Sequence, residues 1–155
     1  MSNRELIEKL KDQTTWRLVG LGIITYGIYL AFYVKRQTGK INIHLSKDAA
    51  ISNKFIVSIF VMSFLSAALL IPYILVESGN PIEKISNLID GLCGIMLVVW
   101  SFKARNRVNS LCSFNTESEG WFHGLWTFLF GPLYFNYKVN RLNENNAEQA
   151  NTADR

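Results

Sequence analysis

Residues 55–76, FIVSIFVMSFLSAALLIPYILV, form the longest uncharged run of the chain, 22 residues in length. A helix of that length, rising about 1.5 Å per residue, matches the roughly 30 Å of a bilayer's hydrocarbon core. Within lipid the backbone must satisfy its own hydrogen bonds, and a helix does so within one segment. The run therefore predicts a transmembrane helix and, with it, an integral membrane protein.

A second apolar run follows closely, over residues 82–102. The five residues that separate the two runs, ESGNP, are turn-forming types, and Lys103, Arg105 and Arg107 follow the second run. The runs are therefore predicted to form a helical hairpin with spans at about 55–76 and 82–102. The three cations are expected to contact anionic lipid headgroups, although the cytoplasmic end of any span carries such residues.

Two other apolar stretches, at about 16–34 and 121–137, are shorter, rich in aromatic residues and interrupted by glycine. If neither crosses the membrane, 15 of the 16 lysines and arginines lie on one side; if both cross, the cations divide 8 to 8. Because cytoplasmic loops carry an excess of these residues, the stretches are predicted to be re-entrant or interfacial hairpins on the cytoplasmic side. Their aromatic residues, Tyr26 among them, are expected in the headgroup region. A short tilted span over 16–34 is the alternative.

The predicted fold class is all-α integral membrane, with one membrane domain over residues 1–142 and both termini cytoplasmic. Ser2 begins a capping-box spacing, and Leu6 and Leu10 share one face, which predicts a short amphipathic helix on the membrane surface. Residues 143–155 are polar without apolar periodicity and are predicted to be a disordered tail. The net charge is +4, but most cations flank apolar runs, so the lipid bilayer is the expected partner and nucleic acid is not.

The first aromatic stretch carries a motif. LVGLGIITYGIYLAFYVKRQTGKIN resembles the opening motif of a domain-of-unknown-function family of small bacterial inner-membrane proteins. In that family an apolar run ends in T-x-G-I-Y and is followed by aromatic residues, basic residues and Asn. The resemblance implies a bacterial inner-membrane protein and brings no activity with it. The matching residues are Thr25, Gly27, Ile28, Tyr29, Tyr33, Lys35 and Asn42.

The second aromatic stretch contains FLFGPLYFNYK, in which Gly131 and Pro132 interrupt an apolar run. Proline removes a backbone donor and biases the preceding residue away from helix. The segment is similar to the F-x-F-G-P-L-W-x-x-Y-R element of another uncharacterised membrane family, with Tyr134 in place of Trp. This resemblance implies membrane class and no activity.

Asp90 lies roughly two turns into the second span. An acidic residue within a span is costly and marks a candidate functional site, here a possible ion pathway for protons or cations. The alternative is that its carboxylate reaches the interface, since Ser86 and Asn87 lie within one turn. Small residues on the two spans are expected to allow close helix packing, within the hairpin or against another subunit or copy. These are Ser63, Ser66, Ala67, Gly91 and Gly94.

Catalytic motifs are missing from the sequence. His44 and His123 are isolated, Cys93 and Cys112 lie in no metal-ligand or redox spacing, and there is no glycine-rich phosphate loop. No enzyme activity and no cofactor or metal are therefore expected. The sequence predicts an accessory or scaffold subunit of a bacterial inner-membrane assembly. The alternative is a small oligomeric channel or transporter for ions or protons that uses Asp90.

Overall fold

The structure is a computed structural model that describes residues 2–75, 77 and 80–153. Within these residues every regular element is a helix, which confirms the predicted all-helical class. The helices are α1 (Asn3–Leu10), α2 (Thr15–Ile24), α3 (Ile28–Asn42), α4 (Asn53–Leu75), α5 (Pro81–Leu111) and α6 (Gly124–Ala153).

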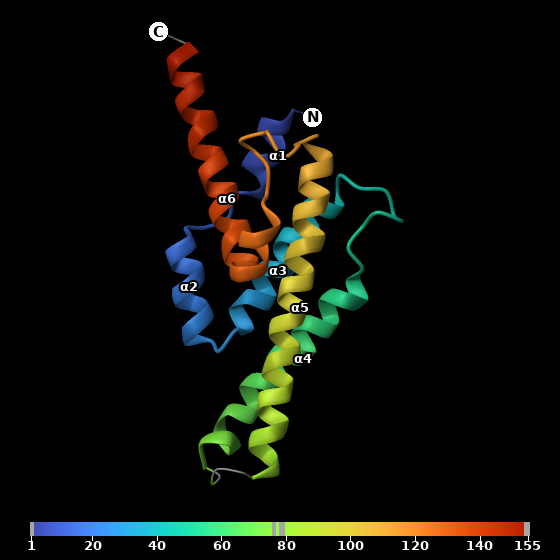
Figure 1. Ribbon diagram of the computed structural model, residues 1–155, viewed down its shortest axis with the longest axis vertical. Helices are drawn as coiled ribbons and strands as arrows, with labels where there is room; N and C mark the ends of the chain where they lie inside the picture. The colour runs from blue at the N-terminus through green and yellow to red at the C-terminus, as the bar shows by residue number, and fades with distance from the viewer. Residues whose placement is uncertain (1, 76, 78–79, 154–155) are drawn as a thin grey trace.

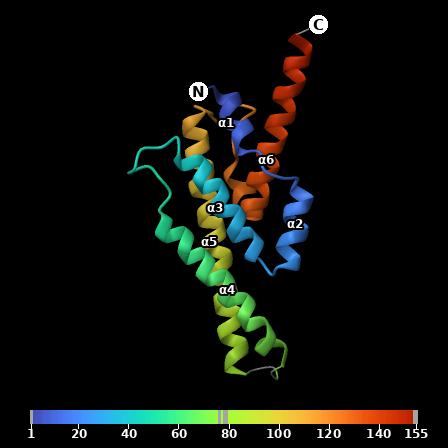
Figure 2. The same cartoon turned by 180° about the vertical axis from the view of Figure 1, so that it is seen from behind.

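Helices α4 and α5 pack side by side as a hairpin that projects from the rest of the molecule (Figure 1, Figure 2). In the described part of the chain, these two helices are long and apolar enough to cross a membrane, and they match the two predicted spans. Asn80 caps α5 by accepting a hydrogen bond from the Ile82 N–H at 3.0 Å. The predicted turn between them is only partly visible, because residues 76, 78 and 79 lie outside the described residues.

The apolar stretch at 16–34 is divided between α2 and α3. The turn between these helices has positive φ at Tyr26 (48°) and Gly27 (84°). Both helices run from this turn back toward the end of the molecule that holds the N-terminus (Figure 1, Figure 2). At about 1.5 Å per residue, the ten residues of α2 extend about 15 Å, which is half of a bilayer core. The stretch therefore does not form one continuous helix.

Helix α6 is bent at Gly131, whose φ of 50° and ψ of −127° are not helical. Beyond the bend it stays helical to Ala153, which differs from the disordered tail predicted for 143–155; residues 154 and 155 lie outside the described part. Packing explains the difference, because Leu142 is buried and Asn143 Nδ2 donates to the Ile7 carbonyl of α1 at 2.9 Å. The tail also includes Glu, Gln and Ala, which favour helix.

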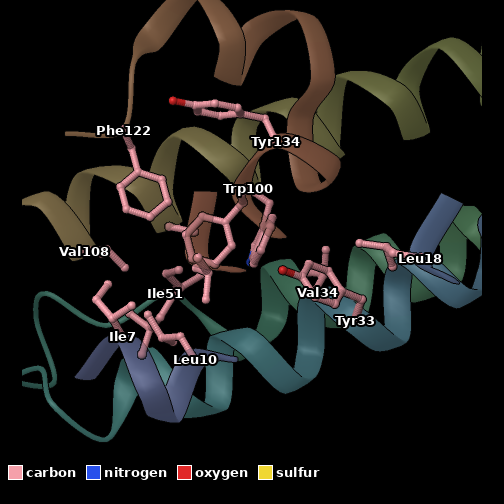
Figure 3. Close-up of a cluster of buried hydrophobic side chains, with 14 of the residues drawn as sticks. Ile7, Leu10, Leu18, Tyr33, Val34, Ile51, Trp100, Val108, Phe122 and Tyr134 are labelled. Carbon is pink, nitrogen blue, oxygen red and sulfur yellow. The ribbon is translucent and has the colours of Figure 1, made fainter. Parts of the chain in front are cut away.

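The core surrounds Trp100 in a body built from α1, α2, α3, α6, the N-terminal part of α4 and the C-terminal part of α5 (Figure 3). The Trp100 ring contacts the rings of Tyr33 and Phe135 edge to face, with centroids 6.2 and 5.6 Å away. Its indole N–H donates to Thr38 Oγ1 at 2.8 Å, so the buried polar atom has a partner. The molecule thus has two parts, a packed body and a projecting hairpin.

Helix α1 belongs to this core. The capping box of Ser2 and Glu5 is present as predicted. The apolar face that includes Leu6 and Leu10 is fully buried against α3 and α6, so it does not rest on a membrane surface. The prediction of a surface-bound helix is therefore wrong: the same amphipathic pattern is satisfied by the protein's own core.

Candidate functional site

Asp90 joins three parts of the fold. It lies nine residues after Pro81 in α5, about 14 Å along the helix. Its Oδ1 accepts a hydrogen bond from Ser66 Oγ of α4, and its Oδ2 accepts one from the Tyr26 hydroxyl at 3.0 Å. Because Tyr26 lies in the turn between α2 and α3, the carboxylate connects the tip of this helix pair to the hairpin. Both carboxylate oxygens have donors from the chain itself.

A cavity of about 600 Å³ lies beside this carboxylate. Its polar lining includes Asp90, Ser66, Tyr26 and Cys93, and the rest of the lining is mainly aliphatic side chains of α2, α3 and α5. The site therefore offers one carboxylate, two hydroxyls and a thiol, with no histidine or lysine in its lining. Among the described residues, no group of three or more His, Cys, Asp or Glu could hold a metal ion.

The small residues predicted to pack the hairpin behave in two ways. Ser63 and Ser66 are buried between α4 and α5, and Ser63 Oγ lies 3.4 Å from Cys93 Sγ. In contrast, a Cβ added to Gly91 or Gly94 would meet no atom within 4 Å. Neither added Cβ would contact α4, although Gly94, one turn after Asp90, lines the same cavity as Asp90 and Cys93. Ala67, which follows Ser66 in α4, is partly buried.

The first motif shapes the turn that presents Tyr26. Thr25 Oγ1 donates to the Leu21 carbonyl at 2.7 Å and accepts from the Tyr29 N–H at 2.9 Å, so it bonds to both helices. Gly27 has the left-handed φ that glycine adopts most easily. The two motif tyrosines, Tyr29 and Tyr33, contact the packed body and not Asp90. The Tyr29 hydroxyl donates to Gln13 Oε1 at 2.8 Å, and Tyr33 is fully buried.

The second motif bends α6. Gly131 provides the non-helical backbone, and Pro132, which lacks an N–H, follows it. The Tyr134 hydroxyl accepts a hydrogen bond from the His123 N–H at 3.1 Å, which fixes the loop that precedes α6. These residues do not meet Asp90.

The three cations that follow the second span contact the chain itself. Arg105 Nε donates to the Phe122 carbonyl at 2.7 Å, and Arg107 Nε donates to the Ala49 carbonyl at 3.1 Å. Lys103 lies over the Phe55 ring, with 5.9 Å between Nζ and the ring centroid. The first two side chains thus hold loops against α5, and their contact with lipid headgroups stays a prediction.

Sequence reasoning selected Asp90 and Ser66 separately and missed Tyr26 as the partner of the acid. Tyr26 and Asp90 are 64 positions apart, and no local pattern links them. Tyr26 is the variable position of T-x-G-I-Y, so the motif gave no signal either. The second cysteine, Cys112, lies in the body and away from Asp90. Burial raises the pKa of its thiol to about 11, so the thiol is neutral at physiological pH.

Family comparison adds to this geometry. The model of a domain of unknown function, DUF4234, matches residues 13–110. The chain belongs to this family. The DUF4234 match runs from just before α2 almost to the end of α5, so it contains Tyr26, Ser66 and Asp90 and leaves α1 and α6 outside. It confirms the expected membership in an uncharacterised family and assigns no activity. Comparisons with curated proteins and with solved structures find no match.

Proposed function

We propose that the protein is a non-enzymatic subunit, accessory or scaffolding, of a bacterial inner-membrane assembly. In this proposal α4 and α5 cross the bilayer, and the body lies on the cytoplasmic side with both termini. The distribution of lysine and arginine supports this orientation, because 15 of 16 then lie on the cytoplasmic side.

The hydrogen bond between Tyr26 and Asp90 supports a re-entrant position for α2 and α3. If α5 enters the outer side of the hydrocarbon core near Pro81, Asp90 lies about 14 Å deep, close to the middle of a core of about 30 Å. The turn at Tyr26 meets the hairpin at that depth, while the other ends of α2 and α3 return to the body. In this placement Tyr26 lies deeper than the headgroup region in which its sequence context predicted it. Non-helical backbone at such depth needs hydrogen-bond partners, and here the Tyr26 and Gly27 N–H groups donate to the Ile23 and Gly22 carbonyls at 3.1 and 2.8 Å.

The observation that carries the subunit role is the open space on α5 beside Gly91, and beside Gly94 where that helix borders the cavity near Asp90. Both glycines are exposed, and open space lies where their side chains would be. Small residues on a span let another helix approach closely, and within this chain no helix uses them. Large apolar side chains flank them on the same helix, such as Leu92 and Ile95, which are 43% and 61% exposed. We infer that a transmembrane helix of another subunit, or of a second copy, packs here.

A channel or transporter centred on Asp90 is the second candidate, and the cavity of about 600 Å³ beside the carboxylate favours it. Against it, both oxygens of Asp90 already accept hydrogen bonds from Ser66 and Tyr26. A carboxylate held in this way joins elements of the fold, so the structural role is preferred. A flux that requires the protein and is abolished by Asp90→Asn, with assembly intact, would reverse this preference.

The test of the proposal is affinity purification of the full chain from native membranes in a mild detergent, with mass spectrometry of what accompanies it. Gly91→Leu is the informative variant, because Gly91 is exposed and a Cβ added there meets no atom within 4 Å, so the fold should stay intact. Gly39→Leu is the matched control, since Gly39 is an exposed helical glycine of α3 that also has open space around it. We expect a stoichiometric partner or second copy, lost in Gly91→Leu and kept in Gly39→Leu. Purification of a single copy without partners, or equal retention in both variants, would contradict the proposal.

A further inference from the structure

A groove between α2 and α6 has an apolar and a polar half. The two helices lie side by side at one edge of the body (Figure 1, Figure 2). The apolar half is a cavity of about 610 Å³ whose lining includes Val19 of α2 and Phe130 and Leu133 of α6. Its lining is almost entirely hydrocarbon and aromatic. A chain of methylene groups is the ligand that such a surface favours.

The polar half is a second cavity, of about 580 Å³, that adjoins the first. Thr15, Trp16 and Tyr137 line both cavities, so the two form one continuous groove. Trp16 is 84% exposed and Tyr137 is 48% exposed. Tryptophan and tyrosine prefer the boundary between hydrocarbon and headgroups, and here they mark the boundary between the two halves.

The charge of the polar half favours an anion. Its lining includes three cations, Lys11, Arg17 and Arg141, and two carboxylates, Asp12 and Glu144. Asp12 is already paired with Arg36, whose Nε and Nη2 donate to its Oδ2 at 3.1 and 2.8 Å. The positive charges that remain are therefore in excess, and arginine binds phosphate oxygens in a bidentate geometry.

Unpartnered polar atoms lie at the same place. Gln13 and Asn140 both line the polar half, and each has one buried atom without a hydrogen-bond partner, Nε2 of Gln13 and Oδ1 of Asn140. Buried polar atoms in proteins are normally satisfied, so such a pair is unusual. Both atoms are closed off from solvent, so they show a wall of the groove with unused hydrogen-bonding capacity and are not direct contacts for a headgroup.

We propose that this groove binds one anionic phospholipid of the bilayer, with an acyl chain along the apolar half and the phosphate headgroup among Arg17, Arg141 and Lys11. The inference rests on the proposed membrane placement, in which the polar half faces the cytoplasmic headgroups and the apolar half faces the hydrocarbon core. A soluble anion would leave the apolar half empty, and a zwitterionic lipid would leave the excess positive charge unmatched.

The test is native mass spectrometry of the full chain in mild detergent with phosphatidylglycerol or phosphatidylcholine of identical acyl chains. We expect phosphatidylglycerol to be retained about tenfold better, because each arginine makes charge-assisted contacts with its headgroup. The double variant Arg17→Gln/Arg141→Gln should lose this preference. Val19→Trp, which fills the apolar half, should weaken retention of both lipids. Lys47→Gln, an exposed cation of the loop between α3 and α4, is the matched control and should keep the preference.

Two results would overturn the lipid site: an unchanged preference in the double variant, or full retention of both lipids by Val19→Trp. Competition by the headgroup alone, glycerophosphoglycerol, as strong as that of the lipid would show that the ligand is a soluble anion. Alkaline extraction of membranes separates this inference from the proposed function. If the protein is washed off the membrane, both the proposed membrane function and the lipid site are wrong. If the protein stays in the membrane but shows no lipid preference, only the lipid site is wrong.

Discussion

At the scale of single residues, the hydrogen bond from Tyr26 to Asp90 joins helices that are far apart in the chain. Tyr26→Phe keeps the ring and removes the donor, which leaves one carboxylate oxygen unsatisfied. We expect a loss of about 1–3 kcal/mol in the free energy of unfolding, measured by thermal or denaturant unfolding in detergent. Tyr137→Phe, at a tyrosine exposed on α6, is the control and should change little. Equal effects of the two variants would mean that the hydrogen bond to Asp90 contributes no stability.

At this scale the sequence predicts only those features that depend on neighbouring residues in the chain. An acidic residue within an apolar run identifies Asp90 without a structure. The partner could not be found in this way, since it depends on how the α2–α3 turn meets α5. The glycines show the same limit: Gly91 and Gly94 were recognised as small, but only the structure shows that open space lies beside both of them.

At the scale of elements, two glycines in the same stretch should respond to substitution in opposite ways. Gly27 has φ of 84° in the turn, with open space around its Cβ, so Gly27→Ala adds backbone strain without a clash and should cost about 1 kcal/mol. Gly20 lies within α2, also without neighbours near its Cβ, so Gly20→Ala should stabilise by up to about 1 kcal/mol. Unfolding midpoints of the two variants check this. Shifts in the same direction would indicate that the stretch is one helix without a turn at Gly27.

Helices of the hairpin were the easiest to predict, because length and hydropathy alone determine them. The Gly131–Pro132 pair correctly marked the interruption in α6, whereas the turn at Gly27 was not located in advance within its glycine-containing stretch. The C-terminal helix was not predicted, since residues 143–153 lack an apolar face and continue a helix that is anchored upstream through Leu142 and Asn143. The apolar face of α1 was recognised, but its pattern does not distinguish a protein core from a membrane surface.

At the scale of the whole molecule, the packed body and the projecting hairpin agree with the uneven distribution of charge. The core lies in the body, at the end of the molecule that holds the N-terminus, whereas the projecting part of the hairpin is covered with exposed apolar side chains (Figure 1). An apolar surface of this extent requires lipid or protein around it. We therefore propose that α4 and α5 cross the bilayer while α2 and α3 enter and leave on the cytoplasmic side.

The most direct test is labelling of single cysteines with a membrane-impermeant maleimide, in a chain whose Cys93 and Cys112 are replaced by alanine. The informative positions are Glu8 before α2, Lys47 after α3, Glu77 after α4 and Glu148 in α6. With this topology, we expect that only Glu77→Cys is labelled in intact cells whose outer membrane is permeable to the reagent. The other three should react only after the inner membrane is opened. Labelling that places Glu8 and Lys47 on opposite sides of the membrane would show that residues 16–34 cross it and would contradict the account.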